Sequence, residues 1–214
     1  MVIKLLFSPD DGKVLGAQIV GVDGVDKRID VISTAMRAGL TVSDLSQVEL
    51  AYAPAYGSAK DAINIAGYVA ENILKGDVEI FHVDEIDLLL RQGGMLLDVR
   101  TRQEFEQGAI QGAIHIHVDD LRKHLNEVPK HKTLLVYCLT GFRSYIACRI
   151  LRLNGFKALN LSGGYMIYCA RHPDDSDRIP GLEGWTRALA LQTLNSTPMI
   201  NHLKTGTEVP KEHV

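Results

Sequence analysis

The most constraining feature of the sequence is the segment 134–156, which predicts a buried strand, a tight loop and a helix in immediate succession. Residues 134–137 are four large side chains in a row, typical of a strand buried on both faces of a sheet. Apolar residues then recur at helical spacing from about Ser144, and Gly155 is placed to end the helix. Cys138 therefore lies where a strand ends and a helix is about to begin.

A cysteine at this position has a defined chemistry. The first N–H groups of a helix lack partners within it and the helix dipole is positive there, so a thiolate is stabilised as a nucleophile. Gly141 permits backbone angles that other residues resist, and Arg143 adds a permanent charge whose guanidinium can tie the loop together. A buried structural thiol remains the alternative for Cys138.

This loop resembles the active-site loop of the rhodanese superfamily, C-x-x-G-x-R-S. Its residues are Cys138, Leu139, Thr140, Gly141, Phe142, Arg143 and Ser144. A second resemblance lies upstream, where residues 96–100 and then Glu104, Phe105, Gly108 and residues 112–114 follow at the family's spacing, with Ala109 where the family often has histidine. The resemblance implies a sulfurtransferase that carries sulfane sulfur as a persulfide on Cys138, with small sulfane-sulfur donors and thiol acceptors as partners.

A cysteine phosphatase is the rival catalytic reading, because that chemistry also combines a cysteine, a loop of backbone donors and an arginine. Phosphatases of this type resemble C-x5-R, whereas only four residues separate Cys138 from Arg143. The shorter loop suits a single sulfur atom better than a tetrahedral anion. A second hypothesis of another class is a non-enzymatic sulfur carrier or docking module that serves a separate flavoprotein.

Polar residues around the strand predicted at 95–99 are expected to support the loop. Thr101 and Glu104 match the T-x-x-E capping box of a helix start, which gives Glu104 a structural role. Asp98 and Arg100 lie at the strand's end, where we expect them to pair with neighbours and hold this segment. The sulfur of Cys138 itself should lie below an accessible mouth.

Two histidines, His115 and His117, alternate along an extended segment and so share one face. No third ligand is evident, and we therefore predict ordinary surface histidines and no metal site.

The first third of the chain carries a second set of motifs. Strands are predicted at 2–7 and 14–20 with a hairpin turn at 10–12, and helices at 26–38, from about 41 and around 63–73. Residues 12–21, 26–30, 52–54 and 57–61 resemble the C-terminal dimerisation domain of the flavin-dependent pyridine nucleotide–disulfide oxidoreductases, with alanines at positions 55 and 62 in place of two prolines. The branch of CoA-disulfide reductases, especially those fused to a C-terminal rhodanese domain, is the most similar.

This second resemblance implies a homodimer and places Tyr52 near the flavin of the partner subunit, although a packed loop aromatic is the alternative for Tyr52. No G-x-G-x-x-G follows a strand. We therefore expect this chain alone to bind no cofactor, and to be the C-terminal part of a reductase. Its flavin and nicotinamide domains would use FAD, NADH and CoA.

Bulk composition is ordinary for a soluble globular protein, with 46% hydrophobic and 23% charged residues among 214. A net charge of −3 without a basic run does not imply nucleic acid, and no apolar stretch approaches the roughly 20 residues of a membrane span. Three cysteines form no disulfide framework and no signal peptide is evident, so we expect a cytoplasmic protein. Cys148 is expected in the core, and Cys169 is a second thiol without a supporting loop.

The predicted fold class is α/β, with a rhodanese-like parallel sheet covered by helices on both faces and preceded by a small α+β dimerisation domain. The domains are expected at 1–76 and 82–172, joined by a short linker at 76–81. In the second domain we predict a helix at 84–92, a short helix capped by Asp119 and Asp120, a strand at 159–161 and a helix opened by residues 162–165. An extension at 173–214 should contain one amphipathic helix with Leu182, Trp185 and Leu189, followed by a disordered end.

Overall fold

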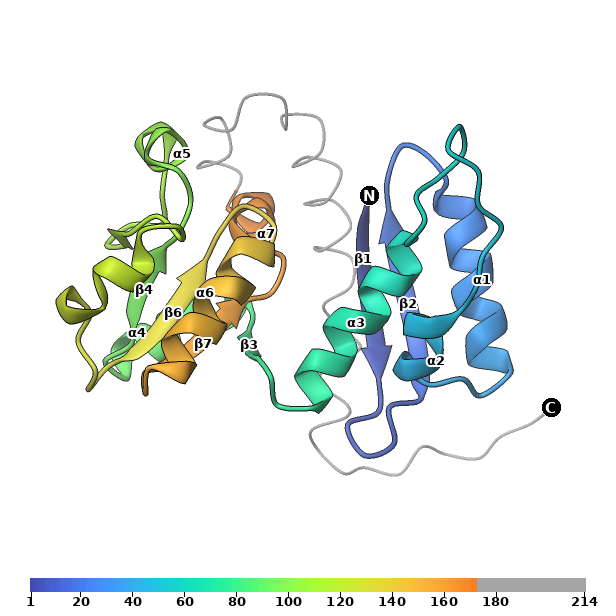
Figure 1. Cartoon of the computed structure of the whole chain (residues 1–214), viewed down its shortest axis with the longest axis horizontal. Helices are drawn as coiled ribbons and strands as arrows, with labels where there is room; N and C mark the ends of the chain where they lie inside the picture. Colours follow the sequence, from blue (N-terminus) through green and yellow to red (C-terminus); the bar gives the residue numbers. More distant parts are fainter. Residues whose placement is uncertain (173–214) are drawn as a thin grey trace. The chain divides into compact units, whose positions relative to one another are not determined.

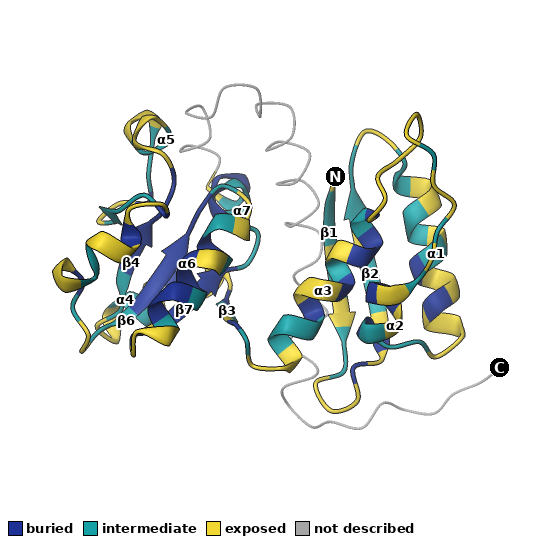
Figure 2. Cartoon of the chain, in the orientation of Figure 1, coloured by how far each residue is buried: buried dark blue, intermediate teal, exposed yellow. Residues whose placement is uncertain are grey.

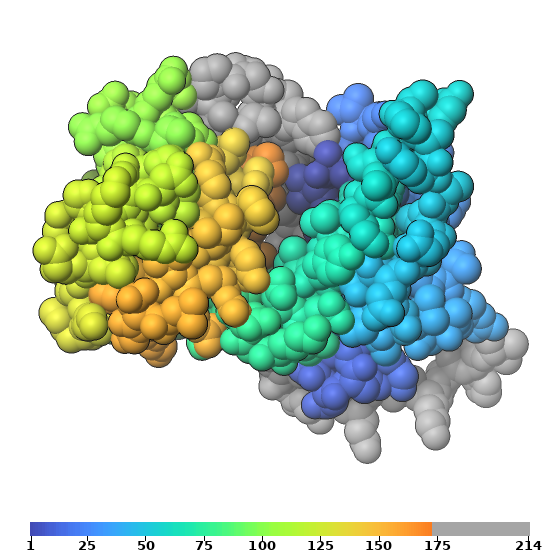
Figure 3. Space-filling model, in the orientation of Figure 1, coloured from blue at the N-terminus to red at the C-terminus, as the bar shows by residue number. Residues whose placement is uncertain are grey.

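The computed structural model of the protein describes residues 1–172. The chain folds as two compact units, Met1–Ile80 and a second that begins at Phe81 (Figure 1). Within each unit, side chains fill the spaces between the ribbons (Figure 3). No helix over the 172 described residues combines the length and apolar character needed to cross a membrane. The predictions for residues 173–214 lie outside the described residues.

The first unit contains a two-stranded antiparallel sheet and three helices, and its predicted elements are confirmed. The strands are β1 (Val2–Phe7) and β2 (Val14–Val20), and the helices are α1 (Val25–Arg37), α2 (Val42–Gln47) and α3 (Ala62–Leu74). Gly12, in the hairpin, has a φ of 70°. Buried residues of this unit lie between its helices and its sheet (Figure 2). Among them Ile32, Val42, Leu45 and Ile63 are at most 1% exposed.

Two of the sequence motifs of this unit meet in space. The guanidinium of Arg28, in α1, makes two hydrogen bonds of 2.9 and 2.8 Å with the carboxylate of Asp61, which also caps α3. Both side chains are largely buried, so the pair fixes the start of α3 against α1.

The second unit is built on a five-stranded sheet in the order β3-β7-β6-β4-β5. Its strands are β3 (Glu79–Phe81), β4 (Met95–Asp98), β5 (Ile114–His115), β6 (Thr133–Tyr137) and β7 (Lys157–Leu161). The pairs β4–β5, β4–β6 and β6–β7 are parallel, as predicted. The second half of the expected linker at 76–81 is therefore strand β3, which lies at one edge of this sheet.

Up to residue 172, the helices of the second unit are three short 3₁₀ turns and four α-helices. They are η1 (Val83–Glu85), α4 (Ile86–Arg91), α5 (Arg102–Gln107), η2 (Leu121–Lys123), η3 (Leu125–Glu127), α6 (Phe142–Leu153) and α7 (Gly164–Arg171). The helix expected at 84–92 thus begins as a 3₁₀ turn. The short helix after Asp120 is instead two 3₁₀ turns, because the Asp120 side chain bonds to Lys123 and caps no helix.

Helices cover both faces of the sheet (Figure 1). One face packs Leu135, Tyr137 and Leu161 against α4 and α7. Since side chains alternate along a strand, Leu134, Val136 and Asn160 point to the other face, where α6 packs on β6 and β7. All four side chains of 134–137 are 0% exposed, which confirms a strand buried on both faces.

Candidate active site

Cys138 lies directly after β6, at the carboxyl edge of the parallel sheet, where sites of α/β proteins are usually found. The loop to α6 is tighter than predicted, because the helix begins at Phe142 and not near Ser144. Gly141 precedes the helix with a φ of 109°, which only glycine adopts readily.

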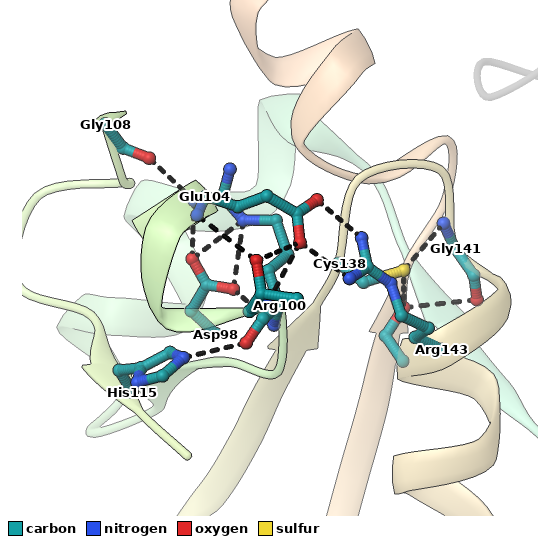
Figure 4. A network of polar contacts seen from close by, with 10 residues as sticks. Asp98, Arg100, Glu104, Gly108, His115, Cys138, Gly141 and Arg143 are labelled. Atoms are coloured by element: carbon teal, nitrogen blue, oxygen red, sulfur yellow. Dashed lines mark hydrogen bonds and ion pairs between the residues drawn. The ribbon is translucent and has the colours of Figure 1, made fainter. Parts of the chain in front are cut away.

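The sulfur of Cys138 is held by groups of its own loop and of the first turn of α6. The backbone N–H of Gly141 donates to Sγ at 3.2 Å, and the hydroxyl of Ser144 donates to it at 3.4 Å (Figure 4). The residue is only 1% exposed. The expectation of an accessible mouth above Cys138 is therefore wrong for this unliganded structure, because loop and helix close around the sulfur.

Arg143 extends from α6 to the carboxylate of Glu104, in α5. Nη1 and Nη2 bind the two carboxylate oxygens at 2.7 Å each, in the fork geometry that arginine and carboxylate share (Figure 4). The bonds from Arg143 are the main reason that the pKa of Glu104 falls to about 2. The Glu104 carboxylate, and then the nearby Cys138 side chain, raise the pKa of Arg143. The guanidinium thus ties the loop to α5 and also faces the sulfur.

Glu104 has a second role at the start of α5, where the predicted capping box is confirmed. Its carboxylate accepts the backbone N–H of Thr101 at 2.9 Å, and the Thr101 hydroxyl accepts the N–H of Glu104 at 3.3 Å. One carboxylate therefore fixes the helix start and the position of Arg143 together.

Asp98 and Arg100 pair with each other, and both are buried, at 0% and 2% exposed. The Arg100 guanidinium binds the Asp98 carboxylate at 2.6 Å and the carbonyl of Gly108 at 2.6 Å. It also lies over the ring of Tyr165, 4.1 Å from its centroid. These contacts bind the end of β4 to the loop after α5 and to α7, which supports the holding role expected for the pair.

The two histidines occupy different environments. Nε2–H of His115 donates to the carbonyl of Arg100 at 2.7 Å, and the ring stacks on Phe105 at 4.8 Å. The prediction of an ordinary surface histidine is therefore wrong for His115, which links β5 to the start of α5. His117 lies 3.7 Å from the carboxylate of Asp119. Among residues 1–172, no three His, Cys, Asp or Glu side chains are grouped so as to hold a metal ion.

The other two cysteines are buried at 0% exposure, and the core position expected for Cys148 is confirmed. Burial raises the pKa of Cys148 to about 12, which makes it a poor nucleophile near neutral pH. In the first unit, the side chain of Tyr52 is 53% exposed. The alternative that Tyr52 is an aromatic side chain packed within its loop is thus wrong for this chain, because more than half of the residue is exposed.

One polar residue near the loop escaped the sequence analysis. Asn160 is 8% exposed in strand β7, between the buried residues Leu159 and Leu161, and its side-chain amide donates to the carbonyl of Gly141 at 3.1 Å. An asparagine inside a buried strand is the signal that could have marked it, since a buried polar group needs a partner.

Comparison with known families assigns both units. Residues 82–171 match the rhodanese-like domain. Residues 1–62 match the dimerisation domain of the pyridine nucleotide-disulphide oxidoreductases. The coenzyme A disulfide reductase of Staphylococcus epidermidis is 48% identical over 69 residues, which are 32% of this chain and 16% of that protein.

Two solved structures resemble both units together. The reduced Bacillus anthracis CoADR-RHD is 48% identical with a TM-score of 0.78, and the match covers 81% of this chain and 31% of that one. A NAD-dependent persulfide reductase from A. fulgidus is 38% identical with a TM-score of 0.66, over 76% and 29% of the two chains. This chain thus spans less than a third of each relative. It joins a dimerisation domain of the pyridine nucleotide-disulphide oxidoreductase family to a rhodanese-like domain, and it is similar in sequence to the coenzyme A disulfide reductases.

Proposed function

We propose that this protein is a sulfurtransferase that carries sulfane sulfur as a persulfide on Cys138. The observation that carries the proposal is the position of the Cys138 sulfur at the start of α6. There it receives the N–H of Gly141 and the hydroxyl of Ser144, and it faces the guanidinium of Arg143. Donors and a cation around one sulfur stabilise a thiolate, which is the nucleophilic form of cysteine.

The transfer would proceed in two displacements at sulfur. The Cys138 thiolate attacks the terminal sulfur of a donor R–S–SH, the bond between the two donor sulfurs breaks, and R–S leaves as a thiolate. Cys138 then carries Cys–S–SH. An acceptor thiolate R′–S attacks the outer sulfur next, which forms R′–S–SH and restores the Cys138 thiolate. Each displacement forms one S–S bond and breaks one, so it needs no external oxidant or reductant.

The residues of the loop have distinct parts in this proposal. Gly141 and Ser144 bind the sulfur, and Arg143 supplies the opposing charge. Leu139, Thr140 and Phe142 offer no charge to a donor, and Phe142 is 69% exposed at the tip of the loop. Thiosulfate, polysulfide, glutathione persulfide and CoA persulfide are all candidate donors. Glu104 holds Arg143 in place. Asp98 and Arg100 bind the end of β4 to α7, whose first turn donates hydrogen bonds to the loop.

We place this activity within a larger persulfide or CoA-disulfide reductase system in the cytoplasm. The match of residues 1–62 to a reductase dimerisation domain supports this placement. In that system two copies of this chain would associate through the first unit, and Tyr52 would lie close to the partner's flavin. FAD, NADH and CoA would be held by flavin and nicotinamide domains, and the sulfur on Cys138 would be passed to them for release as sulfide.

A second candidate is a sulfur carrier that exchanges sulfur only with a docked flavoprotein. The burial of Cys138, at 1% exposed, favours it, because a free donor reaches the sulfur only after the loop or a neighbouring side chain moves. Steady-state turnover with a free donor and a free thiol acceptor separates the two candidates. Turnover supports the enzyme, whereas loading without turnover supports the carrier.

The proposed function is tested by measuring the intact mass of the protein after exposure to each donor, with and without reductant. We expect a gain of one sulfur atom that the reductant removes, and no gain in Cys138→Ser, since a hydroxyl cannot hold sulfane sulfur. Cys148→Ser and Cys169→Ser serve as matched controls and should still gain sulfur. Equal loss of loading in all three variants would refute the assignment of Cys138.

A further inference from the structure

Three carbonyl oxygens of the loop around Cys138 are bound by elements that follow it in the chain. N–H groups in the first turn of α7 donate to the carbonyls of Cys138 (2.8 Å) and Leu139 (3.0 Å). The side-chain amide of Asn160, in β7, donates to the carbonyl of Gly141 (3.1 Å), which also accepts the N–H of Tyr145 (3.0 Å) and the hydroxyl of Ser144 (3.1 Å) from α6. The backbone of the loop is thus held by β7 and α7 as well as by its own turn.

The hydrogen bonds from β7 and α7 to the loop carbonyls determine the direction in which the N–H groups of the loop point. A trans peptide unit holds its C=O and its N–H on opposite sides, and the described chain has no cis peptide bond. Where β7 or α7 binds a carbonyl, the N–H of the following residue is therefore turned away from β7 and α7. The residues concerned are Leu139, Thr140 and Phe142.

The approach of α7 to the loop depends on a glycine. A Cβ added at Gly164 would lie 2.5 Å from the carbonyl oxygen of Cys138 and 2.7 Å from that of Leu139. The φ of Gly164 is +62°, a value that side chains rarely adopt. Glycine is thus the residue that lets the start of α7 reach the loop.

Stability alone does not explain an asparagine at position 160. The side chain is 8% exposed, and its Oδ1 is buried with no hydrogen-bond partner within residues 1–172. A buried acceptor without a donor destabilises a fold, and an apolar side chain of similar size would avoid that cost. What the asparagine supplies is the Nδ2 donor to Gly141, whose own N–H donates to Sγ of Cys138.

We propose that Asn160 is a positioning residue for Cys138, an inference that rests on the sulfur transfer proposed above. Asn160 adds a bond from β7 to the Gly141 carbonyl, which Tyr145 and Ser144 bind from α6, and so anchors the peptide between Gly141 and Phe142 to the sheet. With this peptide anchored, the backbone angles of Gly141 keep its N–H on the sulfur. Most substitutions of buried residues lower the reactivity of a site and the stability of the fold together. Loss of the Asn160 amide should lower the reactivity of Cys138 while the fold keeps or gains stability.

The test compares Asn160→Leu with a matched control, Asn154→Leu. Asn154 makes the same kind of bond at the other end of α6, where its side-chain amide donates to the carbonyl of Ile150 at 2.8 Å. The rate of Cys138 alkylation by iodoacetamide is measured from pH 5 to pH 10 by peptide mass spectrometry. We expect Asn160→Leu to react roughly tenfold more slowly at neutral pH, with the midpoint of its pH profile shifted upward.

Asn154→Leu should keep the wild-type rate and pH profile, and thermal unfolding should show that Asn160→Leu is at least as stable as the wild type. A wild-type pH profile in Asn160→Leu would overturn the inference. If the leucine variant does not fold, Asn160→Ala provides the same test, because it removes the donor without adding bulk or charge. Alkylation needs no sulfur donor, so a wild type that never loads sulfur would refute the proposed function and leave the positioning role to be decided by the alkylation profile.

Discussion

Replacing Glu104 by glutamine removes the charge that faces Arg143 and keeps the size and capping ability of the side chain. The pKa of Glu104 is lowered from 4.5 to about 2, mainly by the hydrogen bonds from Arg143. At about 1.4 kcal/mol for each pKa unit, this shift corresponds to at most about 3.5 kcal/mol of stability at neutral pH. Because glutamine retains the contact with Thr101, we expect Glu104→Gln to lose about 2 kcal/mol.

The stability contributed by the Glu104 carboxylate depends on pH. The carboxyl is easier to ionise in the folded than in the unfolded state, so its contribution is complete above pH 4.5 and is lost as the pH falls toward about 2. Glutamine does not titrate. The stability difference between wild type and Glu104→Gln should therefore be largest above pH 5 and should vanish near pH 2.

Unfolding of the second unit can be followed in urea through the labelling of Cys148, which is buried in the native protein. The reagent is 4,4′-dithiodipyridine, because it reacts with thiols in acid as well as at neutral pH. Glu106→Gln is the matched control, since Glu106 lies in the same helix and its ion pair with Arg102 is exposed, at 60% and 73%. Exposed pairs contribute little, about 0–1 kcal/mol. The reasoning is refuted if Glu104→Gln costs no more than Glu106→Gln, or if its cost is the same at pH 2 and pH 7.

Four further predictions concern the Asp98–Arg100 pair, Arg143, dimer formation and flavin binding. Asp98→Asn should destabilise the second unit by about 3–5 kcal/mol in urea unfolding, because it leaves the buried Arg100 charge without its counterion. Arg143→Ala should slow both alkylation and sulfur loading of Cys138, whereas Arg102→Ala on the exposed face of α5 should leave both rates unchanged. Light scattering at micromolar concentration should give the mass of a two-fold dimer, and a monomer would count against association through residues 1–76. The purified protein should show no flavin absorbance and should leave NADH unoxidised in the presence of CoA disulfide; a yellow protein would contradict this.

Local sequence patterns were sufficient for most of the secondary structure and for placing Cys138 between a strand and a helix. The hairpin at 10–12, the capping box at Thr101 and the strand, loop and helix around Cys138 depend on neighbours within a few residues. Turn geometry, capping hydrogen bonds and the periodicity of apolar side chains determine them, and all three can be recognised from the local sequence. The resemblance to two families was carried by these same local segments.

Contacts between distant residues were decided only by the tertiary structure. Arg143 meets Glu104 across 39 positions of sequence, and Asn160 meets Gly141 across 19. Both pairings follow from the strand order β7-β6-β4, which brings the ends of three strands to one edge of the sheet. The burial of Cys138 and the bond from His115 to the Arg100 carbonyl arise in the same way. Sequence determined which groups are present and the order of most elements, whereas packing of the sheet determined which groups meet, because that choice depends on surfaces far apart in the chain.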